Sequence, residues 1–182
     1  MLAGVTDATA PHPDDPFADV WSANAAFAAD FPLAGLSGVA AKGLALVTCM
    51  DTRIDPLSVL GAEPGDAKII RTAGARVTDD VLRSLVLATN LLGAHRVLVV
   101  AHTDCGLVGS DDEVRAKVAG ALGREPGEAE VAAYDPQAIA EPSSALVADV
   151  ARIRAHPLVP EATVVAAAVY DVATGRLEPV AV

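Results

Sequence analysis

Short apolar runs of β-type residues alternate along this chain with helical patterns. The clearest β-type runs cover residues 44–48, 67–71, 96–101 and 163–170. Helical patterns begin near Pro16, at Asp55, at Thr78 or Asp79, at Ser110, and at Ser143 or Ser144. Strands that are separated by helices pair in parallel, because each helix returns the chain to the same edge of the sheet. The sequence therefore predicts an α/β fold with a mostly parallel sheet of about four to five strands flanked by helices.

Capping residues set the expected limits of several helices. Asp55 followed by Pro56 predicts the start of a short helix, because aspartate caps helices well and proline suits the first helical position. Ser110 with Glu113 forms the sequence pattern of a capping box. Residues 123–142 are rich in Gly, Pro and Glu, which predicts a long surface connection. Near the C-terminus, 174–175 (Thr-Gly) predicts a turn into an extended piece.

The N-terminal part differs in composition from the rest of the chain. Residues 1–15 carry Ala, Pro, Asp and Thr without any period, which predicts a flexible tail. Residues 16–182 are interpreted as a single domain, because this length is enough to bury one core. Within it, residues 16–31 place Phe17, Val20, Trp21 and Phe27 at roughly helical spacing. This spacing predicts an amphipathic helix that needs another surface to pack against.

The overall charge limits the classes of partner. The 182 residues carry a formal net charge of −11, which argues against nucleic acid and against an anionic membrane surface. The N-terminus lacks a basic stretch followed by an apolar run, so no signal peptide is predicted. No stretch of about 18 uncharged apolar residues is present that would span a bilayer. We therefore expect a cytoplasmic protein.

Two short polar segments follow directly on the predicted strands. Residues 49–53 are Cys-Met-Asp-Thr-Arg, and residues 102–106 are His-Thr-Asp-Cys-Gly. Two cysteines and a histidine are good zinc ligands, and a site with three protein ligands keeps the open position that distinguishes catalytic zinc. Ligands of parallel sheets bind beyond the carboxyl ends of the strands, where both segments are expected. A disulfide or two unremarkable thiols is the alternative, and a reducing compartment disfavours the disulfide.

The pattern Cys-x-Asp-x-Arg followed by His-x-x-Cys-Gly resembles the signature of the β-class carbonic anhydrases. In this chain it comprises Cys49, Asp51, Arg53, His102, Cys105 and Gly106. The resemblance covers residues 44–109 and the ending 170–177 (Tyr-Asp-Val-Ala-Thr-Gly-Arg-Leu), and it is greatest to the short actinobacterial-type branch. It implies a β-carbonic-anhydrase-like fold. It also implies a homodimer or tetramer in which the helix within residues 16–31 packs on the partner subunit.

The resemblance implies one Zn²⁺ per chain, held by Cys49, His102 and Cys105. The implied reaction is the reversible hydration of carbon dioxide to bicarbonate and a proton. Zinc lowers the pKa of a bound water, to about 7 on a site with three histidines. Two thiolates neutralise more of the metal's charge, so the water should be less acidic here. We therefore predict activity that rises toward alkaline pH.

The resemblance also implies a pair formed by Asp51 and Arg53 beside the fourth ligand position. Asp51 can accept a hydrogen bond from the attacking hydroxide, or its carboxylate can bind zinc and close the site. Arg53 offers a planar, two-pronged partner that holds Asp51 off the metal. The sequence leaves both arrangements open, and a simple surface ion pair is the alternative. Asp104, within the second segment, is expected to cap the turn after His102.

The small residues Ala73, Gly74 and Ala75 correspond to the substrate loop of the family and suit a very small apolar substrate. Two departures from the family pattern flank this loop: Thr72 replaces a common Asn, and Arg76 stands where smaller or apolar residues are usual. They leave the zinc chemistry intact but bear on substrate preference and rate. Hydrolysis of carbonyl sulfide by the same chemistry is therefore an alternative, and a non-catalytic zinc protein is another.

Overall fold

The computed structural model describes residues 15–182, so the predicted tail lies almost wholly outside the described residues. The chain divides into two compact units, Met1–Leu36 and Ser37–Val182. Helix α1 (Ala18–Ala29) lies in the first unit, within the range predicted to be helical, and none of its residues is buried. The division after Leu36 separates this helix from the unit that contains the sheet.

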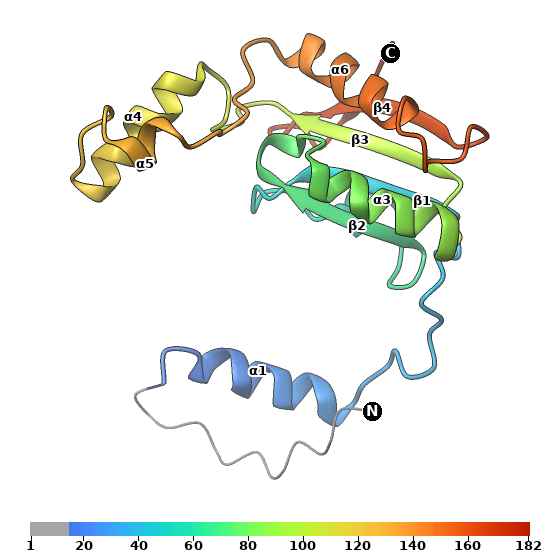
Figure 1. Ribbon diagram of the computed structural model, residues 1–182. Helices are drawn as coiled ribbons and strands as arrows, with labels where there is room; N and C mark the ends of the chain where they lie inside the picture. The colour runs from blue at the N-terminus through green and yellow to red at the C-terminus, as the bar shows by residue number, and fades with distance from the viewer. Residues whose placement is uncertain (1–14) are drawn as a thin grey trace. The chain divides into compact units, whose positions relative to one another are not determined.

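The second unit is built on one five-stranded sheet with the order β2-β1-β3-β4-β5 (Figure 1). Its strands are β1 (Leu44–Cys49), β2 (Ala67–Thr72), β3 (Arg96–His102), β4 (Val164–Tyr170) and β5 (Leu177–Val180). The first four strands are parallel, and β5 pairs with β4 in the antiparallel direction. This confirms the predicted α/β class, and the predicted C-terminal extended piece is the antiparallel edge strand.

Three helices of this unit begin where the capping residues predict. The helices of the unit are α2 (Pro56–Leu60), α3 (Asp79–Leu91), α4 (Asp111–Leu122), α5 (Ala129–Ala132) and α6 (Pro142–Arg154), with a 3₁₀ turn η1 (Ala73–Ala75). Asp55 caps α2 by accepting a hydrogen bond from the Ser58 backbone N–H. Thr78, and not Asp79, caps α3, and Ser110 with Glu113 forms the predicted capping box at α4. None of these helices, within residues 15–182, is long and apolar enough to cross a membrane.

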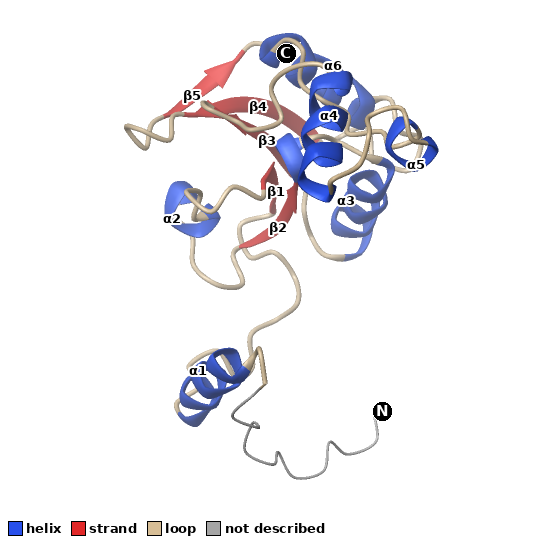
Figure 2. Ribbon diagram, turned by 90° about the vertical axis from the view of Figure 1, so that its left-hand side faces the viewer, coloured by secondary structure: helices blue, strands red, loops and turns tan. Residues whose placement is uncertain are grey.

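Alternating strand residues build the core on the two faces of the sheet. Helices α3 and α6 cover one face, and α2 lies on the other (Figure 2). The larger core joins strand residues such as Val47 and Val99 to Leu85 of α3 and Ile153 of α6. Leu46 and Val100 point to the opposite face, because successive side chains of a strand alternate. The strands are therefore held on both faces, which fixes the positions of their carboxyl ends.

The segment 123–142 corrects the prediction of a plain surface connection. It contains α5, and Val131 and Ile139 within it are buried. Ile139 pairs with Val108 in an isolated bridge, so the segment returns to the loop that follows β3. Glycine and proline content does not reveal these contacts, because two buried apolar residues among polar ones give no hydrophobic periodicity. Figure 1 shows α4 and α5 extending away from the carboxyl end of β3 before the chain returns.

The start of α6 also differs from the prediction by one or two residues. Glu141 is the N-cap, and its carboxylate accepts hydrogen bonds from the backbone N–H groups of Ser143 and Ser144. Pro142 occupies the first helical position, where its fixed backbone angle and missing N–H are tolerated. A glutamate can therefore take the capping role that the two serines were predicted to have.

Candidate metal site

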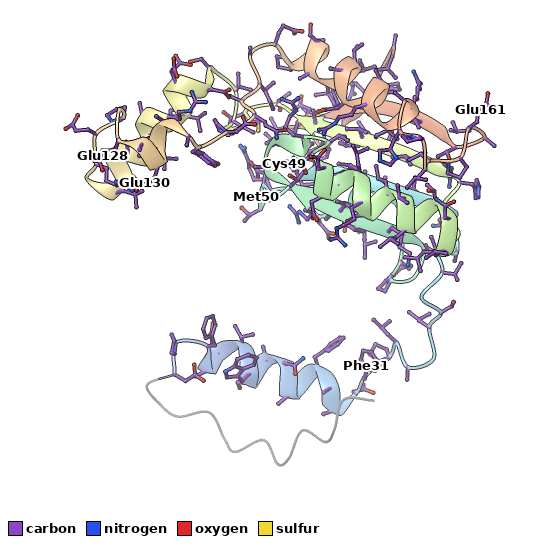
Figure 3. The ribbon with its side chains drawn as sticks, viewed as in Figure 1. Phe31, Cys49, Met50, Glu128, Glu130 and Glu161 are labelled. Atoms are coloured by element: carbon purple, nitrogen blue, oxygen red, sulfur yellow. The ribbon has the colours of Figure 1, made fainter. Side chains whose placement is uncertain are left out.

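The two central strands deliver the predicted ligands to one edge of the sheet. Cys49 is the last residue of β1 and His102 is the last residue of β3, and these strands pair directly in parallel register. Figure 3 shows Cys49 at this end of the sheet, next to the exposed Met50. Cys105 follows three residues after His102, in the loop that leads toward α4. The fold therefore brings together the three residues that the sequence predicts as ligands.

The donor atoms of Cys49, His102 and Cys105 all lie within 4.8 Å of one another. Both cysteines of the chain belong to the described part, and each is a free thiol. The His102 ring nitrogen Nδ1 lies 2.9 Å from the carbonyl oxygen of Thr103. With Nδ1 donating there, Nε2 carries the lone pair, since a neutral imidazole has one donor and one acceptor nitrogen.

The Nε2 atom of His102 is the clearest sign of a missing ligand partner. It is buried, and among residues 15–182 it has no hydrogen-bond partner. Buried polar atoms are rarely left unpaired, and a histidine oriented through its other nitrogen is typical of metal sites. Two sulfurs and one imidazole nitrogen suit zinc. Burial is the main cause that raises the pKa of Cys105, and the adjacent Cys49 thiol raises it further. A backbone hydrogen bond with Leu107 acts in the opposite direction. A bound cation would lower the pKa of this thiol.

Asp51 lies beside this group and is held from one side by Arg53. The Arg53 Nη2 donates to Asp51 Oδ2 at 2.7 Å, and Nε donates to Oδ1 at 3.0 Å. The Arg53 backbone N–H donates to the same Oδ1 at 2.9 Å. These hydrogen bonds hold the pKa of Asp51 far below its usual range, so it is ionised at any working pH. The geometry corresponds to the arrangement in which Arg53 engages Asp51, whose Oδ2 is 3.9 Å from His102 Nε2.

Asp104 has a different role from the predicted turn cap. Its carboxylate accepts a hydrogen bond from Arg53 Nη1 at 2.7 Å, and its backbone carbonyl accepts one from Nη2 at 3.0 Å. Asp51 and then Asp104 raise the pKa of Arg53 above its ordinary value. Asp104 has a positive φ of 55°, which turns the chain between His102 and Cys105. The guanidinium therefore connects the two ligand segments, 49–53 and 102–106.

Arg71 is a further contributor that the sequence reasoning did not assign. From β2, its Nε donates to the Cys49 carbonyl at 3.0 Å and its Nη2 donates to the Asp51 carbonyl at 2.6 Å. The available signal is its position at the carboxyl end of the strand that neighbours β1. Thr72, the first departure from the family pattern, contributes its backbone carbonyl, which accepts a hydrogen bond from the Met50 N–H at 3.1 Å.

An open cavity of about 500 Å³ adjoins the three ligands. Asp51 and Arg53 line one part of it, and Ala73 and Gly74 line another. These two members of the predicted substrate loop therefore face the space beside the ligands. Ala75 does not line this cavity; it is buried and lines a second, smaller cavity, which His102 and Cys105 also line. The wall beside the ligands thus consists of small side chains.

Position 74 requires a glycine, both for its backbone conformation and for the space around it. It has a φ of +64°, and an added Cβ would lie 2.6 Å from Leu107 Cδ2 and 2.9 Å from Ile139 Cδ1. Gly61 has a similar φ of +57° with no atom near the Cβ position, so it is a matched control. We expect Gly74→Ala to lower the free energy of unfolding by roughly 1–3 kcal/mol more than Gly61→Ala, the typical cost of overpacking. Urea denaturation of both variants measures this; equal losses would show that Leu107 and Ile139 move aside freely.

Comparison with known proteins gives one consistent family. The family model "Carbonic anhydrase" matches residues 44–177. The "Beta-carbonic anhydrase 1" of Mycobacterium tuberculosis is 36% identical over 140 residues, covering 76% of this chain and 82% of the relative. The "Carbon disulfide hydrolase" of Acidianus sp. is 33% identical over 168 residues, covering 81% of this chain and 82% of the relative.

A solved structure agrees with the sequence matches. The crystal structure of carbonic anhydrase from Streptococcus mutans superposes with a TM-score of 0.80 at 35% identity, covering 91% of this chain and 97% of that one. The matched region includes both ligand segments and four of the five strands in full. By sequence, by fold and by the residues at the edge of its sheet, this chain belongs to the β-class carbonic anhydrase family.

Proposed function

We propose that this protein is a carbonic anhydrase that binds one Zn²⁺ per chain and interconverts carbon dioxide with bicarbonate and a proton. Cys49, His102 and Cys105 would hold the metal. The observation that carries this proposal is the buried Nε2 of His102, which has no hydrogen-bond partner among residues 15–182. The ring of His102 is grouped with two free thiols, beside a carboxylate held by arginine. Family membership supports the same reaction, since the mycobacterial relative is named for it.

The side chains at the site have separable roles. A zinc ion held here would supply hydroxide from a bound water near neutral pH. Asp51 is too acidic to take up that proton, so it acts as a hydrogen-bond acceptor that orients the attacking group. Arg53 donates to both oxygens of Asp51 and so fixes the direction of its lone pairs. Ala73 and Gly74 leave room beside the ligands for a small linear molecule.

A second candidate reaction is the hydrolysis of carbon disulfide or carbonyl sulfide. The Acidianus relative, named a carbon disulfide hydrolase, is nearly as similar to this chain as the mycobacterial carbonic anhydrase. Carbonyl sulfide and water give carbon dioxide and hydrogen sulfide, and carbon disulfide with two waters gives carbon dioxide and two hydrogen sulfides. All three substrates present a linear, electrophilic carbon to the same nucleophile.

A direct comparison of the three substrates on one zinc-loaded, reduced preparation separates these candidates. Proton release reports carbon dioxide hydration, and sulfide release reports the other two reactions. We expect kcat/KM for carbon dioxide to be the largest of the three. Rapid sulfide release with slow hydration would instead assign the chain to the sulfur substrates, and no turnover of any substrate would favour a non-catalytic zinc protein.

The pH dependence tests the ligand set. Because two thiolates neutralise the metal, the water should lose its proton at higher pH than on a site with three histidines. Asp51 and Arg53 keep their charges throughout, so they add no titration in this range. We expect kcat/KM for carbon dioxide to rise between about pH 7 and about pH 9. A rate that stays flat over this range would contradict the proposed thiolate ligands.

We also propose that the protein assembles as a homodimer or a tetramer through α1. The helix and its N-cap residue carry large apolar side chains that are about half exposed: Phe17 at 57%, Trp21 at 51% and Phe27 at 51%. Such a set of exposed aromatic residues is typical of a protein interface. Light scattering at micromolar concentration should give at least twice the chain mass, and Trp21→Asp should weaken the assembly. A monomer at that concentration would contradict this proposal.

We infer a cytoplasmic location from the state of the cysteines. Both thiols are free in the structure, and the proposed metal site needs them reduced. Reducing compartments keep thiols in this state. Fractionation of the source cells with an antibody against this chain tests the location, and recovery outside the cytoplasm would contradict it.

A further inference from the structure

A second arginine–carboxylate pair lies behind the ligands and is more buried than the pair of Arg53 with Asp51. Arg76 Nε donates to Asp149 Oδ2 at 2.8 Å, and Nη2 donates to Oδ1 at 3.3 Å. The exposed fractions of the two side chains are 19% for Arg76 and 6% for Asp149. Arg76 directly follows the η1 turn, and Asp149 lies on α6. The pair therefore joins the turn beside the open cavity to a helix of the core.

The remaining guanidinium nitrogen of Arg76 donates hydrogen bonds to another segment of the chain. Its Nη1 donates to the carbonyls of Gln137 and Ala138, at 3.0 and 3.4 Å. We refer to residues 137–139 as the strap. The strap is bonded in turn to the loop that carries Cys105: the Ile139 N–H donates to the Leu107 carbonyl at 3.0 Å, and the Gly109 N–H donates to the Ile139 carbonyl at 3.1 Å.

A small cavity shows how near this network lies to the ligands. It has a volume of about 20 Å³, enough for about one water molecule. Its lining includes Arg76, Asp149 and Ile139 of this network together with His102 and Cys105. The pair and the strap thus adjoin two of the three predicted metal ligands around one small cavity.

The backbone at both ends of this network adopts an unfavourable conformation. Ala75 and Gln137 have positive φ values of 59° and 52°, which non-glycine residues rarely adopt. Arg76 follows Ala75 in the chain and binds the Gln137 carbonyl, so its contacts stabilise both positions. A buried ion pair is no more stabilising than a well-packed apolar pair of the same volume. Fold stability alone therefore does not account for the two charges.

We propose that Arg76 and Asp149 are positioning residues for the metal site. The pair fixes the strap, and through the strap it fixes the loop with Cys105, so that the donor atoms of His102 and Cys105 keep their separation. This inference rests on the metal-dependent function proposed above. It also gives Arg76, which departs from the family pattern beside the substrate loop, a role at the metal site, whereas the sequence predicted an effect on substrate preference and rate alone.

The test separates support of the ligands from fold stability. Arg76→Met alone leaves a buried, unpaired carboxylate, and we expect it to lower Tm by about 10 °C. The double variant Arg76→Met with Asp149→Leu removes both charges, and its Tm should return close to the unaltered value. Its strap still lacks the arginine donor. We therefore expect zinc to bind about 10- to 100-fold more weakly, as when outer partners of metal ligands are removed.

Zinc affinity is read by competition with a chromophoric chelator, and the absorption spectrum of the Co²⁺-substituted protein reports the ligand geometry. Arg152→Met is the matched control. Arg152 also lies on α6, pairs with Asp79 and donates to the Val77 carbonyl, without a hydrogen bond to the strap. It should leave zinc affinity and the Co²⁺ spectrum unchanged. In the double variant, kcat for the preferred substrate should fall with little change in KM.

The proposal would be overturned if the double variant, with its Tm restored, kept the zinc affinity and the Co²⁺ spectrum of the unaltered protein. The pair of Arg76 and Asp149 would then serve only the stability of the fold. Both readouts are independent of the reaction. If the unaltered protein holds zinc but turns over no substrate, the proposed reaction fails and the positioning role is still decided by zinc affinity. If the unaltered protein binds no zinc, both proposals fail.

Discussion

Replacing His102 by alanine should release the metal and lower the rate of carbon dioxide hydration by about 1,000-fold or more, because hydroxide would no longer form near neutral pH. His102 supplies the single nitrogen of the ligand group, and its Nε2 is buried. Two cysteines alone leave two ligand positions open and hold zinc weakly. Zinc content after dialysis and stopped-flow hydration measure the two expected losses together.

His95→Ala is the matched control for this variant. His95 is an exposed histidine just before β3, at the opposite end of the strand from His102. It should retain zinc and full activity. Should His102→Ala keep both its zinc and its rate, the ligand set proposed here would be wrong.

Replacing Arg53 by alanine should lower kcat/KM by about 100-fold while the protein keeps its zinc, a loss typical of a misplaced group at an active site. The variant removes the two side-chain hydrogen bonds to Asp51 and the contacts with Asp104. The pKa of Asp51 would then rise toward its ordinary value, since those bonds are the main cause of its low pKa. Its carboxylate would be free to bind the metal and occupy the position needed by water.

Arg83→Ala is a suitable control for the loss of an arginine–aspartate pair. Arg83 forms an exposed ion pair with Asp80 on α3, and such surface pairs contribute little. Its activity should match that of the unaltered protein. Full activity in Arg53→Ala, with zinc bound, would show that Asp51 does not need to be held from the metal. Reduced zinc content would instead give Arg53 a role in forming the site.

Much of the fold follows from local patterns in the sequence. The apolar runs that end at Cys49 and His102 are β1 and β3, and the capping residues Asp55 and Ser110 mark helix starts correctly. These features depend on residues close together in the chain. The juxtaposition of the two ligand segments follows as well, because parallel neighbouring strands end at the same edge.

The supporting contacts could not be predicted in this way. Arg53 and Asp104 are 51 positions apart, and Arg76 and Asp149 are 73 apart. An arginine has many acidic residues within its possible reach in an acidic chain, and only the packed fold selects the partner. The Ile139 contacts were missed for a related reason: scattered buried residues in a polar, proline-rich segment carry no periodic signal. Spacing along the chain thus predicts the ligands better than the residues that hold them.

The measurement that tests the central claim most directly is stopped-flow carbon dioxide hydration by the reduced, zinc-loaded protein at alkaline pH, with Cys105→Ala measured in parallel. We predict fast hydration by the unaltered protein and a rate near background for the variant, which lacks one thiolate of the ligand group. No hydration by the unaltered protein, with one zinc bound per chain, would contradict the account and direct attention to the sulfur substrates. Equal rates in the two proteins would contradict the proposed ligand set.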